Sequence, residues 1–142
     1  MPIHQEIMFS ATPDRVYELF TDSEKFAAAS GGRPANIELA DGAAFSVFGG
    51  FVQGRQIELV QNERIVQAWR FSDWAPGIYS IVRLTLTPWG MGTKLELDQD
   101  AIPEGSSPTH PTWQDHIAAN WAVYYYEPFK AYLANSANSI AA

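Results

Sequence analysis

Residues 112–133 read TWQDHIAANWAVYYYEPFKAYL, and this stretch decides how the rest of the chain folds. Its large apolar side chains recur at steps of three and four, which places them on one broad face of a helix. They are Trp113, Ile117, Trp121, Tyr124, Tyr125, Phe129 and Tyr132. Such a face packs against a sheet as core, but rings with polar tips also line cavities that hold small apolar molecules. The pattern predicts a long covering helix and leaves both roles open for its aromatic residues.

The residues between 36 and 100 predict the sheet that this helix covers. Their pattern has a period of two and is interrupted by turn sequences such as Asp41-Gly42 and Gly49-Gly50. Turns this short join antiparallel neighbours. Together with a first strand at residues 3–9, we expect strands at residues 36–39, 43–48, 51–60, 64–71, 78–87 and 93–99.

Two short helices are expected between the first strand and the others. Thr12-Pro13-Asp14 places a proline at the first helical position, and Gly31-Gly32 ends a second helix that starts near Ser23. The order of elements predicts an α+β fold. A curved antiparallel sheet of about seven strands would wrap around the long C-terminal helix, with two short helices after the first strand.

Alternation within the predicted strands separates an inner face from an outer face. Arg70 and Arg83 fall on the outer face, where charged side chains usually serve solubility. The inner face is expected to hold Ile65, Gln67, Trp69 and Phe71 from one strand, and Ile78, Ser80, Val82, Leu84 and Leu86 from the next.

Composition limits the classes of protein to consider. The 142 residues suit one domain, which we place at residues 1–134, with residues 135–142 as a frayed C-terminal tail. Cysteine is absent, which excludes thiolate chemistry and is typical of a cytoplasmic protein. A net charge of −7 without a basic stripe predicts no binding to nucleic acid. The chain has no apolar run long enough for a membrane span, and its start lacks the features of a secretory signal.

Several short motifs, in this order and spacing, resemble a known family. They are residues 11–17 (ATPDRVY), Phe48-Gly49-Gly50, residues 58–60 (ELV), residues 63–70 (ERIVQAWR), residues 92–95 (GTKL) and Asn120-Trp121. Nearly the whole chain is similar to the START-like or helix-grip superfamily (SRPBCC), in the branch homologous to the activator of the heat-shock protein 90 ATPase. The branch commonly has glycine where this chain has Asn120. The resemblance implies a helix-grip fold with a cavity between the sheet and the last helix, and it implies a role in stress response.

We predict that a small hydrophobic ligand, lipidic or aromatic, binds in this cavity. It would enter near the short helices and the loop at residues 101–111, and Pro128 should kink the helix beside it. The predicted ligand-binding residues are Phe48, Phe51, Gln67, Trp69, Phe71, Trp74, Val82, His110, Trp113, Ile117, Trp121 and Tyr125.

Two other functions remain open at this point. The family resemblance implies a chaperone cofactor that docks through its surface on a heat-shock protein. An enzyme acting on a cyclic apolar substrate would need acid or base groups, for which Glu58, Asp73 and His110 are the candidates. No metal or cofactor is expected, because the six-residue spacing of His110 and His116 does not place both on one helical face. The sequence fits a monomer or a homodimer.

Overall fold

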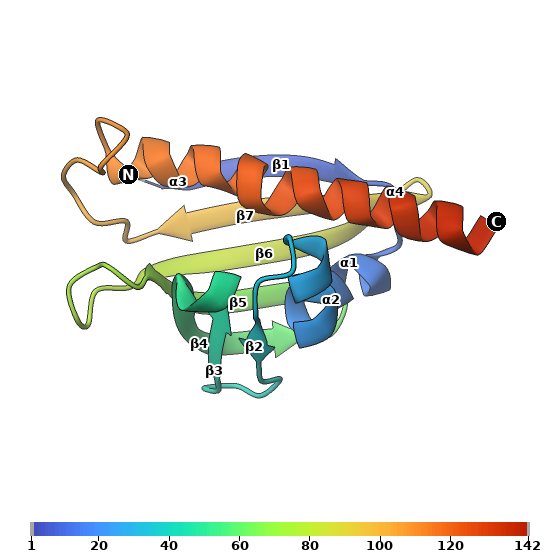
Figure 1. The fold of residues 1–142 in the computed structure, drawn as a ribbon, viewed down its shortest axis with the longest axis horizontal. Coiled ribbons are helices and arrows are strands. Elements are labelled where there is room, and N and C mark those ends of the chain that lie inside the picture. Colours follow the sequence, from blue (N-terminus) through green and yellow to red (C-terminus); the bar gives the residue numbers. More distant parts are fainter. Residues whose placement is uncertain (1, 142) are drawn as a thin grey trace.

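The computed structural model describes residues 2–141, with side chains described as far as Asn135. One antiparallel sheet has the strand order β1-β7-β6-β5-β4-β3-β2, and the long C-terminal helix lies across it (Figure 1). The strands are β1 Ile3–Phe9, β2 Asn36–Ile37, β3 Ala44–Val47, β4 Val52–Val60, β5 Arg64–Phe71, β6 Ser80–Trp89 and β7 Gly92–Asp100. The predicted α+β helix-grip architecture with seven strands is therefore confirmed.

The two short helices pack beneath the C-terminal half of the long helix (Figure 1). Phe20 and Phe26 meet Phe129 edge to face, with ring centroids 5.0 and 5.3 Å apart. None of the helices within residues 2–141 has the length and apolar character of a membrane span. The helical elements are α1 Pro13–Thr21, α2 Ser23–Ala29, the 3-10 turn η1 Phe48–Gly50, α3 Trp113–Asn120, the π-helical segment η2 Trp121–Tyr126 and α4 Glu127–Ala141.

The long helix changes its hydrogen-bonding pattern next to Pro128, where the sequence predicts a kink. Proline has no N–H, so the carbonyl of Tyr124 loses its α-helical partner. The preceding residues Trp121–Tyr126 are π-helical, and the α-helix resumes at Glu127. The helix continues through this point without a break (Figure 1). The irregularity therefore takes the form of a wider turn.

The backbone of α4 is helical to Ala141. The boundary at residue 134 between a domain and a frayed tail therefore stays a prediction.

Strand β6 begins later than the sequence predicts. It starts at Ser80, so Ile78, which we expected on the inner face, lies in the preceding loop and is 42% exposed. Arg70 holds this loop from the outer face. Its guanidinium donates hydrogen bonds to the carbonyl oxygens of Ile78 and Ala75, both at 3.2 Å, and to that of Trp74. Arg70 thus fixes the loop that follows its own strand.

Strand β4 passes very close to its neighbours at Gly54. A Cβ atom at this position would lie 1.8 Å from the carbonyl oxygen of Ala68 and 2.7 Å from the ring of Phe45. We expect Gly54→Ala to lower the free energy of unfolding by about 3 kcal/mol, because the backbone of β5 would have to move.

Urea unfolding followed by circular dichroism measures this change. Thr87→Ala, at an exposed position of β6, is the control and should change the stability by less than about 0.5 kcal/mol. A Gly54→Ala variant as stable as the parent would contradict the close approach of the strands.

Candidate functional site

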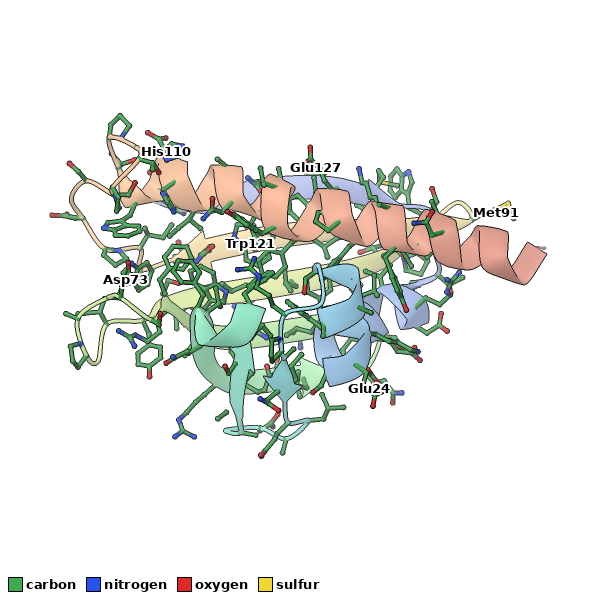
Figure 2. The ribbon with its side chains drawn as sticks, viewed as in Figure 1. Glu24, Asp73, Met91, His110, Trp121 and Glu127 are labelled. Carbon is green, nitrogen blue, oxygen red and sulfur yellow. The ribbon has the colours of Figure 1, made fainter. Side chains whose placement is uncertain are left out.

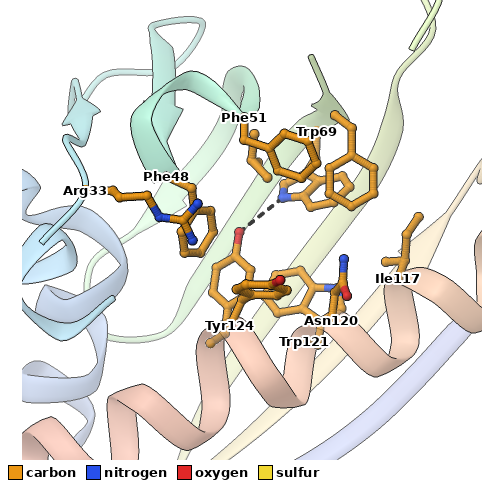
Figure 3. Close-up of a pocket in the computed structure, with 11 residues that line it drawn as sticks. Arg33, Phe48, Phe51, Trp69, Ile117, Asn120, Trp121 and Tyr124 are labelled. Carbon is orange, nitrogen blue, oxygen red and sulfur yellow. Dashed lines mark hydrogen bonds between the residues drawn. The ribbon is translucent and has the colours of Figure 1, made fainter. Parts of the chain in front are cut away.

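A cavity of about 240 Å³ lies between the sheet and the long helix (Figure 3). Arg33, Phe51 and Tyr124 line it and are themselves exposed, so the opening of the cavity lies among these three side chains. The lining residues are Arg33, Phe48, Phe51, Val52, Trp69, Phe71, Ile117, Asn120, Trp121, Tyr124 and Tyr125.

Three stacked or hydrogen-bonded rings form the wall of the cavity. Trp121 and Tyr125 are one helical turn apart, and their rings stack with centroids 4.0 Å apart. From the sheet, Trp69 lies nearly parallel to Trp121 at 6.2 Å and donates its Nε1–H to the Tyr125 hydroxyl at 3.4 Å (Figure 3). Aromatic contacts and a buried hydrogen bond therefore join helix to sheet at this wall.

A buried polar chain behind this wall fixes the position of Trp121. Its Nε1–H donates to Oε1 of Gln99 at 2.8 Å, and Nε2 of Gln99 donates to the hydroxyl of Ser80 at 2.9 Å. The Ser80 hydroxyl in turn donates to the backbone carbonyl of Trp69, also at 2.9 Å. All four residues are at most 2% exposed, so water does not reach these polar groups. Each group therefore depends on its partner within the protein for a hydrogen bond.

The opposite wall is built by a left-handed turn at the end of β3. Phe48, Gly49 and Gly50 have φ angles of 55°, 67° and 98°, which is unusual for the phenylalanine because its Cβ crowds the backbone there. The N–H of Gly49 donates to the carbonyl of Pro34 at 2.9 Å, which attaches the turn to the loop that follows α2. The Phe48 ring meets Tyr125 edge to face at 5.1 Å.

Charge is scarce in the cavity lining. Arg33 is its one charged member, and its Cζ lies 5.4 Å from the centroid of the Phe48 ring. Burial raises the pKa of the Tyr125 hydroxyl, so this group is a neutral phenol at physiological pH. The site therefore combines apolar ring faces with one cation at its opening.

The structure brings together seven of the twelve predicted ligand-binding residues. Phe48, Phe51, Trp69, Phe71, Ile117, Trp121 and Tyr125 all line the cavity. Sequence reasoning missed Arg33, Val52, Asn120 and Tyr124 as lining residues. Tyr124 belonged to the helical aromatic pattern, whereas Arg33 lies in a loop without any periodic signal.

The other five predicted residues do not line the cavity. Trp74 and Trp113 pack against each other at 5.6 Å, and His110 lies beside His116 with ring centroids 5.1 Å apart. Val82 is fully buried within the sheet. Gln67 lines a smaller void of about 10 Å³ farther along the sheet.

The aromatic cluster around Trp74 and Trp113 closes one end of the sheet. Phe71 contacts Trp74 at 5.5 Å, and His116 at 5.6 Å. Burial lowers the pKa of His116, and neighbouring His110 lowers it further, which favours the neutral ring. We expected a ligand to enter near the short helices and residues 101–111. The cavity opens at Arg33, in the loop after α2, whereas Trp74, Trp113 and His116 pack together away from this opening.

The candidate acid and base groups do not assemble at the cavity. Glu58 pairs with Arg64 at 2.6 Å on the half-exposed outer part of the sheet, and Asp73 is exposed on the loop after β5 (Figure 2). His110 lies in the loop before α3 and does not line the cavity. Within the described residues no three histidine or carboxylate side chains come together as a metal site.

Together, the sheet, the covering helix and the aromatic cavity between them define a helix-grip protein. Residues 10–134 match the family described as "Activator of Hsp90 ATPase homolog 1-like protein". The chain belongs to this family, as the sequence motifs predict.

Relatives with known names agree with this assignment. The mouse protein "Activator of 90 kDa heat shock protein ATPase homolog 2" is 33% identical over 104 residues, which are 71% of this chain and 30% of the mouse protein. The chain spans about a third of the length of the curated relatives it matches.

Solved structures share the fold. An HSP90 activator from Plasmodium falciparum superimposes with a TM-score of 0.86 at 24% identity, over 94% of this chain and 96% of the other. The Aha1 dimer from Colwellia psychrerythraea gives a TM-score of 0.72 at 14% identity, over 89% of this chain and 92% of the other.

The polar chain behind the cavity gives a test of the wall. Gln99→Leu would leave the Trp121 indole N–H buried without its acceptor and would remove the hydrogen bond that the Ser80 hydroxyl accepts, although this hydroxyl would still donate to Trp69. We expect the free energy of unfolding to fall by about 3 kcal/mol, because each unsatisfied buried group costs about 1–3 kcal/mol. Gln61→Leu, at an exposed turn position, is the matched control. Urea unfolding measures both, and equal stability of the two variants would show that the polar chain contributes nothing.

Proposed function

We propose that this protein binds a small hydrophobic ligand, lipidic or aromatic, in the cavity between the sheet and the C-terminal helix. The observation that carries this proposal is the cavity of about 240 Å³ lined by aromatic ring faces. Cavities of this kind, largely apolar with a few polar groups, are the usual sites for small molecules.

The hydrogen bonds of the wall support an apolar occupant. The polar tips of Trp69 and Trp121 are bonded to Tyr125 and Gln99, so the surfaces they present to the cavity are their ring faces. Water in contact with such faces finds few partners. An apolar ligand that displaces this water gains affinity.

The size of the cavity limits the ligand. A cavity of about 150 Å³ with apolar walls is known to hold benzene. At about 240 Å³, this cavity has room for one or two fused rings or a short branched chain. Phe51 and Tyr124 are 43% and 44% exposed at the opening, where their rings would contact the part of the ligand that is still outside.

A neutral two-ring probe tests this proposal. We expect 2-naphthamide to bind in isothermal titration calorimetry and to shift the indole N–H signals of Trp69 and Trp121 in nuclear magnetic resonance spectra. The indole of Trp89, which is 56% exposed on the β6–β7 hairpin, should not shift. Absence of binding, or shifts confined to Trp89, would argue against the cavity as a ligand site.

A pair of variants separates cavity binding from surface binding. Asn120→Phe places a ring at a lining position and should weaken 2-naphthamide binding at least about tenfold, because the ring competes for the same volume. Ala119→Phe puts the same ring on the neighbouring exposed position and should leave affinity unchanged. Thermal unfolding confirms that both variants fold. Equal affinity of the two variants would contradict binding in the cavity.

A second candidate function is that of a chaperone cofactor. It is favoured by family membership and by relatives whose names describe activators of a 90 kDa heat-shock protein ATPase. This chain corresponds to only about a third of those proteins.

We therefore expect weak stimulation of chaperone ATP hydrolysis, about twofold or less, from this chain alone. A steady-state ATPase assay with a 90 kDa heat-shock protein measures it. If the docking uses the outer surface, Asn120→Phe should leave the stimulation unchanged while it weakens 2-naphthamide binding. Strong stimulation by the parent chain would place the chaperone function first.

A further inference from the structure

We infer that the ligand carries one anionic group, such as a carboxylate, and that Arg33 binds it while a flat apolar body occupies the cavity. This inference rests on the proposed ligand-binding function and specifies the chemical class of the ligand. The remaining lining residues are aromatic or aliphatic apart from the Asn120 amide, and none of them is acidic. A cation beside an apolar cavity without an acid in its lining favours an amphiphilic anion.

The Arg33 guanidinium is placed for such contact. Its Cζ lies over the Phe48 ring at 5.4 Å and 6.0 Å from the centroid of the Tyr124 ring, and it reaches from its loop toward the cavity (Figure 3). Contact with aromatic rings does not use the hydrogen-bonding capacity of the guanidinium N–H groups, which can still meet a ligand. Those N–H groups form a planar fork that matches the two oxygens of a carboxylate.

Within the described side chains, no internal partner competes for this fork. Among the side chains described through Asn135, no acidic group lies within ion-pair distance of Arg33. The ion pairs found there belong to other residues, such as Lys25 with Glu18 and Arg64 with Glu58. An arginine that neighbouring acids leave unpaired is available to an incoming anion.

The loop that carries Arg33 is fixed to the cavity wall. The carbonyl of the next residue, Pro34, accepts the Gly49 N–H at 2.9 Å, so this loop and the left-handed turn that carries Phe48 are joined. On the other side, Gly31 and Gly32 have φ angles of 91° and 85°, which only glycine adopts readily. The backbone that carries Arg33 is therefore fixed beside the cavity before any ligand arrives, which reduces the entropy lost on binding.

The net charge of −7 does not oppose this assignment. At an ionic strength of about 0.15 M the Debye length is about 8 Å, so distant surface carboxylates are screened at the cavity. The local guanidinium decides the sign of the potential that a bound carboxylate meets. Because Arg33 is exposed, this attraction should also weaken as salt is added.

An acid and its amide of nearly the same shape test the inference. We expect 2-naphthoate to bind at least about tenfold more tightly than 2-naphthamide in isothermal titration calorimetry at pH 7 and an ionic strength of about 0.15 M. Arg33→Gln should weaken 2-naphthoate about tenfold and change 2-naphthamide by less than about twofold, because only the acid uses the charge. Arg83→Gln, which removes the same charge from the outer face of β6, should change neither.

The outcomes distinguish a failure of the anionic ligand class from a failure of the proposed ligand-binding function. If 2-naphthamide binds and 2-naphthoate binds no better, or if Arg33→Gln weakens both probes equally, the anionic class is wrong while the cavity proposal stands. If neither probe binds the parent protein, the proposed function itself fails. Raising the salt concentration to about 1 M should reduce the advantage of 2-naphthoate, whereas an advantage that salt does not change would overturn the role of Arg33.

Discussion

Several hydrogen bonds attach the long helix to the sheet, and the one made by Trp121 lies directly behind the cavity wall. The indole N–H of Trp121 is bonded to Gln99 of β7, and its ring is stacked on Tyr125 of its own helix. Because a buried N–H must keep its partner, the ring cannot tilt to fill the space beside it. Trp121 is therefore held in place as part of the cavity wall.

The two halves of the site come from different parts of the chain and have different physical origins. The apolar half belongs to the rigid centre, where β5 and the long helix present Trp69 and Trp121. The charged half belongs to the connection between α2 and β2, held by the bond between Gly49 and Pro34. A positive φ at Phe48 costs about 1–3 kcal/mol, so this turn persists only because its surroundings determine it.

Periodicity predicted the apolar half of the site and missed the charged half. Trp121 and Tyr125 follow from the helical pattern, and Trp69 and Phe71 follow from alternation in one strand. Arg33 follows a pair of glycines and carries no period, so only the folded chain reveals that it reaches Phe48. Likewise, alternation cannot distinguish an aromatic residue that lines a cavity from Trp74 and Trp113, which fill space by packing on each other. The fold was predictable because each of its elements repeats a pattern, whereas a cavity depends on the volume that side chains leave empty.

A π-helical turn contains one residue more than an α-helical turn, so the segment Trp121–Tyr126 holds one extra residue. The extra residue allows Tyr125 and Tyr126, which are neighbours in sequence, both to be buried, one at the cavity and the other with its hydroxyl donating to Gln5 of β1 at 2.8 Å. An α-helix turns about 100° per residue, so removing a residue within α4 would rotate Leu133 away from the core. Removing one residue within Trp121–Tyr126 would instead let the segment close to α-helical rotation, still without the hydrogen bond that Pro128 cannot donate, while Ile117 and Phe129 keep their common face. Within this helix, a deletion during evolution would therefore be accommodated most readily beside the cavity, where it would change which aromatic rings form the wall.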